Sequence, residues 1–196
     1  MDKDQEIKEL RRDLRLMKLR RQVTPHFLFN SLSVAVGLVM TSPKTAAKFL
    51  RLVAEMYRYL LRFGDEYTVP VEQEMLMMRQ YFELMSLRHV GCLKLCVSHE
   101  ARQLKKHPLP PFALQGLLEN AIKHNAHTTA RPLTIKIDTD GSWLIVSNNL
   151  QPLVSVEKES THFGLAYMNE TMQLLFEKEI IVEKNETTFS VKLPLV

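Results

Sequence analysis

Glycine is scarce in this sequence. Only six of the 196 residues are glycine, and neither a G-x-x-x-x-G-K nor a G-x-G-x-x-G run is present. Those runs bind phosphate in P-loop and dinucleotide-binding proteins, because glycine lets the backbone approach a phosphate closely. The G-x-S-x-G turn that presents a nucleophilic serine is absent too. Any nucleotide site in this chain must therefore be built in another way.

Cysteine is rarer still, with only Cys92 and Cys96. Two cysteines are too few for a disulfide framework, so a reducing, cytosolic setting is expected. Together with His89 and His99 they follow the pattern H-x2-C-x3-C-x2-H. Zinc fingers separate their ligand pairs by a longer loop that folds round the ion. Structural zinc is therefore not expected.

Long hydrophobic runs are also missing. The longest mostly apolar stretch, residues 27–40, contains Asn30, Gly37 and two serines, and it is too short to span a bilayer. The first four residues lead into a charged helix, so no signal peptide is expected. Hydrophobic residues make up 45% and charged residues 24%, which is ordinary for a soluble globular protein of one or two domains.

The net charge of +4 is concentrated in two segments. Residues 1–21 carry eight Lys/Arg against five Asp/Glu, and residues 43–63 carry five against one. Basic helices can face an acidic partner, nucleic acid or a membrane, although a solvated helix surface is the simpler explanation. A nucleic-acid binder would use the interleaved cations Arg11, Arg12, Arg15, Lys18, Arg20 and Arg21.

Helical periodicity dominates the first 89 residues. A short apolar seam precedes residue 18, and it allows either a parallel two-helix dimer or packing on the same chain. Helices to about Met40 and from Pro43 to about Phe63, with Ser42 as N-cap, predict an antiparallel hairpin; two hairpins would make a four-helix bundle. A third helix is expected from Val69-Pro70 to about His89. The seam before residue 18 consists of Ile7, Leu10, Leu14 and Met17. The apolar stripe of the third helix consists of Val71, Met75, Met78, Phe82 and Met85. Glu72 and Glu74 lie in the first turn of that helix, where acidic side chains suit the helix dipole.

Beyond residue 92 the period changes to two, which indicates strands. The pattern predicts an α+β fold, in which the helical hairpin precedes a sandwich of helices on an antiparallel-rich sheet. The expected elements are a strand at 93–98, a loop at 99–111, a helix at 112–123, strands at 133–138 and 142–148, a loop at 149–162, a helix at 163–176, and strands at 179–184 and 187–195.

The stretch from Gln22 to Leu32 contains a histidine directly after a proline. Pro25 should kink any helix that runs through it, so His26 would lie at a bend. Histidine can act as a neutral nucleophile near pH 7. Taken alone, the stretch is also explained by an ordinary helix histidine whose ring is satisfied by a backbone carbonyl.

A second polar cluster lies on the helix expected at 112–123. Glu119, Asn120, Lys123 and His124 stand at i, i+1, i+4 and i+5, so much of one helical face is polar. Oxygen ligands there can hold Mg²⁺, while lysine neutralises phosphate and a carboxylate orients a proton acceptor. An amphipathic helix with a solvated polar face is the alternative.

Three motifs together resemble the LytS/YehU-type sensor histidine kinases: P-H-F-L-F-N-S-L at 25–32, V-E-Q-E-x6-Y-F-E-L-x3-R at 71–88, and L-P-P-F-A-L-Q-G-L-L-E-N-A-I-K-H at 109–124. The resemblance implies a helical dimerisation and phosphotransfer region at 1–89 and a GHKL (Bergerat) ATP-binding domain at 90–196. It makes His26 the phosphoacceptor and Asn120 the Mg²⁺ ligand of Mg·ATP, with Lys123 and His124 beside the nucleotide. Since Phe27 rather than an acid follows His26, the general base is unassigned, and Glu119 is the candidate.

The resemblance extends to two boxes that depart from the family pattern. The stretch S-N-N at 147–149, which includes Asn149, lies where the acidic box that reads adenine falls, and Asn148 takes the place of the usual aspartate. Gly164 is the glycine kept in the lid box. His162, Tyr167 and Thr171 stand where glycine, asparagine and arginine are usual. These departures leave open a nucleotide-poor dimeric scaffold that binds a regulator without phosphorylating itself.

The resemblance implies the cytoplasmic core of a two-component kinase that phosphorylates His26 from ATP. The phosphoryl group would pass to a response regulator, often of the LytTR type. A homodimer through the N-terminal helices and an upstream transmembrane sensor of an inner-membrane protein, outside this chain, complete the expectation. Direct nucleic-acid binding is not part of it.

Overall fold

The computed structural model describes residues 25–152 and 163–196. The chain separates into two compact units, Met1–Val53 and Ala54–Val196. The boundary predicted between residues 89 and 90 separates functional regions, whereas the division between Val53 and Ala54 reflects packing. The predicted boundary therefore stays a prediction. The seam at 7–17 and His162 lie outside the described residues.

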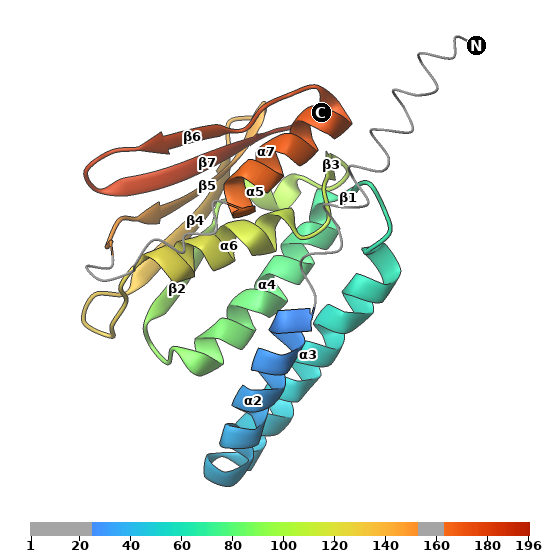
Figure 1. Cartoon of the computed structure of the whole chain (residues 1–196). Coiled ribbons are helices and arrows are strands. Elements are labelled where there is room, and N and C mark those ends of the chain that lie inside the picture. Colours follow the sequence, from blue (N-terminus) through green and yellow to red (C-terminus); the bar gives the residue numbers. More distant parts are fainter. Residues whose placement is uncertain (1–24, 153–162) are drawn as a thin grey trace. The chain divides into compact units, whose positions relative to one another are not determined.

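In the first unit, α2 (Pro25–Thr41) is followed by α3 (Pro43–Phe63), which continues into the second unit. The two helices form the predicted hairpin (Figure 1). Ser42 lies between them, and its carbonyl accepts the Ala46 N–H at 2.9 Å, as expected of the residue before a helix. The buried apolar side chains among the described residues of this unit are Ala35, Ala46, Phe49, Leu52 and Val53.

The second unit contains a five-stranded sheet in the order β2-β4-β5-β7-β6. Among the strand pairs described for this sheet, β2–β4 alone is parallel, so the antiparallel-rich sheet is confirmed. The strands are β2 (Leu93–Val97), β4 (Leu133–Thr139), β5 (Trp143–Asn149), β6 (Ile181–Lys184) and β7 (Thr188–Pro194).

Three longer helices belong to this unit: α4 (Val71–Arg88), α6 (Ala113–His124) and α7 (Phe163–Phe176). Helices α6 and α7 cover one face of the sheet, and α4 lies against α6 (Figure 1). The core lies between α6 and the sheet, where alternate strand residues face the helix. Its fully buried members include Leu114, Leu118, Leu133, Ile135, Ile137 and Leu144.

The loop expected over residues 99–111 is wrong in two places. A short helix, α5 (His99–Gln103), begins after Ser98, whose hydroxyl accepts the Ala101 N–H at 3.1 Å. A two-residue ladder joins β1 (Val69–Pro70) to β3 (Pro108–Leu109). A five-residue helix shows too little periodicity to detect, and a ladder between segments some 40 residues apart depends on tertiary packing.

Within the described ranges, no helix has both the length and the apolar character that a bilayer crossing requires.

Candidate functional site

Helix α6 carries the predicted magnesium and phosphate residues. Its apolar side is anchored in the core by Leu114, Leu117 and Leu118, so the opposite side must face outward. Glu119 and Lys123 are exposed there, while Asn120 and His124 are half-buried. The structure therefore presents the four side chains on the open face of a helix that the core holds firmly.

Gly164 lies beside Asn120. It belongs to the first turn of α7, and a Cβ added to Gly164 would lie 4.0 Å from Asn120 Oδ1. The two residues are 44 positions apart in sequence, and the packing of α7 on α6 brings them together. The missing side chain keeps space open next to the amide oxygen that is the predicted metal ligand.

Asn148 is buried on the face of β5 that the helices cover. It alternates with Leu144 and Val146, whose side chains belong to the core, and only 4% of its surface is exposed. Its Nδ2 donates to the Asn149 carbonyl at 2.9 Å. A polar side chain at this place, on the same face as α6, suits recognition of a planar ligand edge.

Asn149 points elsewhere. Its Oδ1 accepts the Thr134 N–H at 2.7 Å and its Nδ2 donates to the Pro132 carbonyl at 3.2 Å. These bonds brace β5 against the beginning of β4. The role of Asn149 in binding a cofactor stays a prediction.

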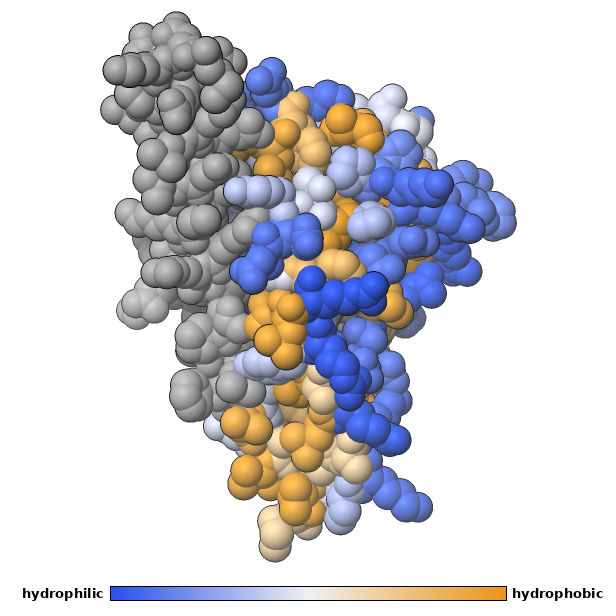
Figure 2. Space-filling model, turned by 90° about the vertical axis from the view of Figure 1, so that its right-hand side faces the viewer, coloured by the Kyte–Doolittle hydropathy of each residue, from blue (hydrophilic) through white to orange (hydrophobic). Residues whose placement is uncertain are grey.

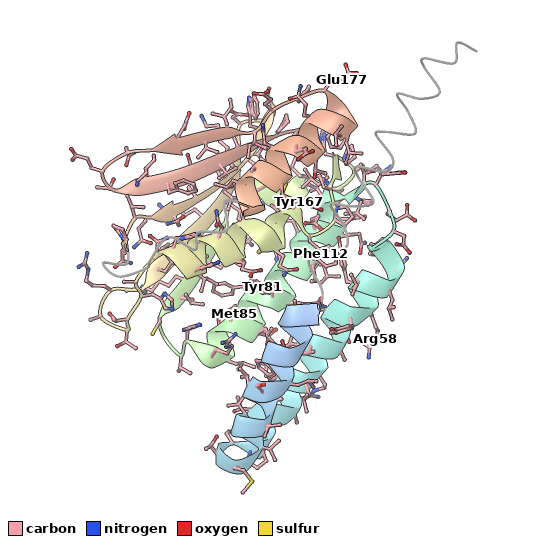
Figure 3. The ribbon with its side chains drawn as sticks, viewed as in Figure 1. Arg58, Tyr81, Met85, Phe112, Tyr167 and Glu177 are labelled. Carbon is pink, nitrogen blue, oxygen red and sulfur yellow. The ribbon has the colours of Figure 1, made fainter. Side chains whose placement is uncertain are left out.

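Helix α7 supplies a buried polar atom with no partner among the described residues, the Thr171 hydroxyl. Buried hydroxyls are normally hydrogen-bonded, so this orphan marks a place where a ligand or water can bind. Tyr167, one turn earlier, is half-buried and has partners within the protein (Figure 3).

His26 lies in the first turn of α2, which begins at Pro25. Its side chain is outside the described residues, as is everything before Pro25. The expected kink and the role of His26 as phosphoacceptor therefore stay predictions.

Asn125 is a site residue that the sequence reasoning missed. It is buried directly after α6; its Nδ2 donates to the Ala121 carbonyl at 2.8 Å, and its Oδ1 accepts the Gln151 N–H at 2.7 Å. It thus ties the end of α6 to the segment after β5. Both hydrogen-bond partners of Asn125 are backbone groups, and no sequence pattern indicates such a side-chain-to-backbone contact.

Tyr81 brings α4 into electrostatic contact with the predicted base. It is buried beside α6 (Figure 3), and burial is the main cause that raises the pKa of its phenol. The negative charge of Glu119 raises that pKa further, whereas Arg88 lowers it. Glu119 therefore lies close enough to Tyr81 for the two titratable groups to interact electrostatically.

Glu74 was also missed, because it was assigned to the dipole of its own helix. It is fully buried, and its carboxylate accepts backbone N–H groups at the beginning of α6, from Phe112 at 2.8 Å and from Leu114 at 2.9 Å. Burial raises the pKa of Glu74 to about 7, although its hydrogen bonds act in the opposite direction. The detectable signal was its position: Glu74 is three residues after Val71 and four before Met78, on the apolar stripe of α4.

The H-x2-C-x3-C-x2-H pattern does not gather into a metal site. No group of three or more potential ligands occurs in the part of the chain described by the structure. His89 instead pairs with His127, with 3.0 Å between His89 Nδ1 and His127 Nε2.

The part of the chain that contains His26 matches a known protein family. The family model described as histidine kinase matches residues 14–92. Sensor protein kinase HptS of Staphylococcus aureus (strain USA300) is 35% identical over 128 residues, which cover 64% of this chain and 24% of HptS. The chain therefore spans about a quarter of the length of the curated relatives it matches.

Solved histidine kinases are more distant. The catalytic domain of histidine kinase ThkA gives a TM-score of 0.47 at 15% identity, covering 65% of this chain and 96% of that chain. Histidine kinase AdeS of Acinetobacter baumannii gives 0.42 at 17%, covering 95% and 97%. Likeness at this level carries no argument about function.

The match over residues 14–92, which include His26, supports a histidine kinase. The 35% identity to the sensor protein kinase HptS and the motifs at 25–32, 71–88 and 109–124 support the same kind of protein. The chain is therefore similar to the sensor histidine kinases of the LytS/YehU type.

Proposed function

We propose that this chain is the cytoplasmic core of its sensor kinase, binds Mg·ATP in the second unit and phosphorylates His26. The observation that carries the proposal is the meeting of Asn120 and Gly164 on α6 and α7, on the sheet face where Asn148 is buried. The orphan hydroxyl of Thr171 supports a ligand at this face.

The residues present fit the substrate. Asn120 Oδ1 is a hard oxygen ligand of the kind Mg²⁺ prefers, and Lys123 supplies positive charge for phosphate. Asn148 offers an amide to the adenine edge as a neutral partner. In the transfer, the bond between the γ-phosphorus and the bridging oxygen of ADP breaks while a bond forms to a ring nitrogen of His26; Glu119 is the candidate acceptor of any ring proton.

A homodimer is proposed through the α2–α3 hairpin. Its described surface exposes several large apolar side chains, which Figure 2 shows along the lower part of the view. Unpartnered apolar patches on a helical hairpin are typical of protein interfaces. The exposed residues are Leu32, Val36, Val39, Met40 and Leu50.

A response regulator, of LytTR type by resemblance, would take the phosphoryl group from His26. Attachment to a membrane sensor outside this chain belongs to the same proposal, which the relationship to the sensor kinase HptS supports.

The test is autophosphorylation with γ-labelled ATP and Mg²⁺. Label that is acid-labile, appears on the wild type and is lost in His26→Gln and Asn120→Ala is the expected result. His99→Gln is the matched control, since His99 is an exposed histidine on α5, and it should keep the label. Absence of label together with absence of ATP binding would reject the kinase and favour a scaffold that binds the regulator without phosphorylation.

A further inference from the structure

The beginning of α6 is held by a buried acidic side chain from another helix. Glu74 of α4 accepts the Phe112 N–H on Oε1 and the Leu114 N–H on Oε2. Oε1 also accepts the hydroxyl of Tyr59, from α3, at 2.5 Å. One carboxyl group thus joins three helices. Glu74 is fully buried and Tyr59 is 7% exposed, so water does not reach these groups to replace the hydrogen bonds between them.

Phe112, the N-cap of α6, is strained. Its backbone has φ 65° and ψ 12°, a left-handed conformation that side chains other than glycine rarely adopt. Such residues persist where their surroundings over-determine them, and they gather at functional positions. Here the Glu74 bond fixes the backbone, and the ring stacks edge-on against Tyr59, with centroids 5.2 Å apart.

Tyr59 therefore contacts the beginning of α6 twice, through its ring on Phe112 and through its hydroxyl on Glu74. All three residues belong to the second unit. Tyr59 also lies on α3, the helix whose earlier part forms the hairpin with α2. A rotation of α3 about its axis would move both contacts together.

Asn120 lies eight residues after Phe112 on the same helix, about 12 Å along its axis. A helix packed against a sheet moves as a rigid body, so a displacement where α6 begins is carried to its polar face. Misplacement of a binding group by about 1 Å can reduce a rate roughly a hundredfold.

We infer that Glu74, held by Tyr59, is a positioning residue that fixes α6 for nucleotide binding and couples it to the state of α3. The inference rests on the proposed nucleotide function of α6. Neither side chain touches the nucleotide; both act through the backbone of Phe112 and Leu114.

Tyr59→Phe in the full chain is the sharpest test, since it keeps the ring and removes only the hydroxyl. Two quantities are measured where the fluorescence of Trp143 shows the protein fully folded: hydrogen exchange of the α6 amides, and the Kd for Mg·ATP. Exchange at the beginning of α6 should rise roughly tenfold, with a severalfold weaker Kd. Tyr57→Phe, a half-buried tyrosine of the same helix, is the control and should change neither quantity.

A hydroxyl that only stabilises the fold would lower the melting temperature and leave Kd unchanged in the folded protein, and that result overturns the inference. Unchanged exchange in α6 overturns it as well. Glu74→Gln gives a second readout, because an amide presents one acceptor oxygen to two N–H groups, and its Kd should weaken at least as much. If the wild type binds no nucleotide, the proposed function fails, while exchange in α6 still decides whether Tyr59 positions that helix.

Discussion

Glu74 makes the stability of the second unit depend on pH in a direction unusual for a hydrogen-bonded acid. Burial raises its pKa to about 7 in the folded protein, against an ordinary value of 4.5. The folded state therefore binds the Glu74 proton more tightly than the unfolded chain does. Its stabilising contribution is complete below about pH 4.5 and is lost as pH rises through about 7.

The size of the effect follows from the shift. Each pH unit between the two pKa values changes the free energy of unfolding by 1.36 kcal/mol, so the loss from pH 5 to pH 8 is roughly 2 to 3 kcal/mol. Glutamine carries no titrating proton, and Glu74→Gln should remove this component. The difference in unfolding free energy, wild type minus variant, should thus fall by that amount across the range.

Urea unfolding followed by fluorescence of Trp143, the single tryptophan, measures this difference at each pH. Subtracting the variant cancels the other titrating groups. Glu72→Gln is the matched control, because Glu72 lies in the same helical turn but is exposed, and its difference should change little with pH. A flat difference for Glu74→Gln would refute the reasoning; a difference that grows with pH would show that its hydrogen-bond donors outweigh burial.

Three further predictions concern the site and its supports. Gly164→Ala should leave the Kd for Mg·ATP nearly unchanged, since its Cβ meets Asn120 Oδ1 at an ordinary 4.0 Å, whereas Gly164→Val should weaken it roughly tenfold; equal effects would contradict this. Asn125→Ala breaks two buried hydrogen bonds and should lower the unfolding free energy by about 2–3 kcal/mol in urea titrations, and a loss below 0.5 kcal/mol would be inconsistent with it. Burial, followed by His127, lowers the pKa of His89 below its ordinary value of 6.5. Its stabilising contribution is therefore present above about pH 6.5 and is lost as pH falls toward the lowered pKa. His89→Gln should flatten that loss in unfolding curves from pH 5 to 7.5, and an unchanged slope would speak against it.

The order of elements was largely predictable because periodicity is local. A 3.6-residue repeat placed the end of α2 and the bounds of α3, α4, α6 and α7 close to where they are observed, and alternation placed the main strands. The hairpin between β4 and β5 followed from Asp140-Gly141, and Gly141 has the positive φ of 90° that such a turn requires.

Local sequence pattern could not predict which residues contact each other in the folded chain. Glu72 and Glu74 are equivalent in sequence terms, two acids in one helical turn, yet one is exposed and the other is buried against α6. Asn148 and Asn149 are adjacent, but the alternation of the strand turns the first toward the helices and leaves the second to brace β4.

The sequence by itself determined the α+β order, the polar face of α6 and the motifs that resemble those of sensor histidine kinases, because these depend on neighbours along the chain. Tertiary structure decided that Gly164 lies beside Asn120, that Asn125 ties α6 to the segment after β5, and that Glu74 holds the beginning of α6. Each of these joins segments tens of residues apart, and burial and hydrogen bonding between them arise only when the chain folds.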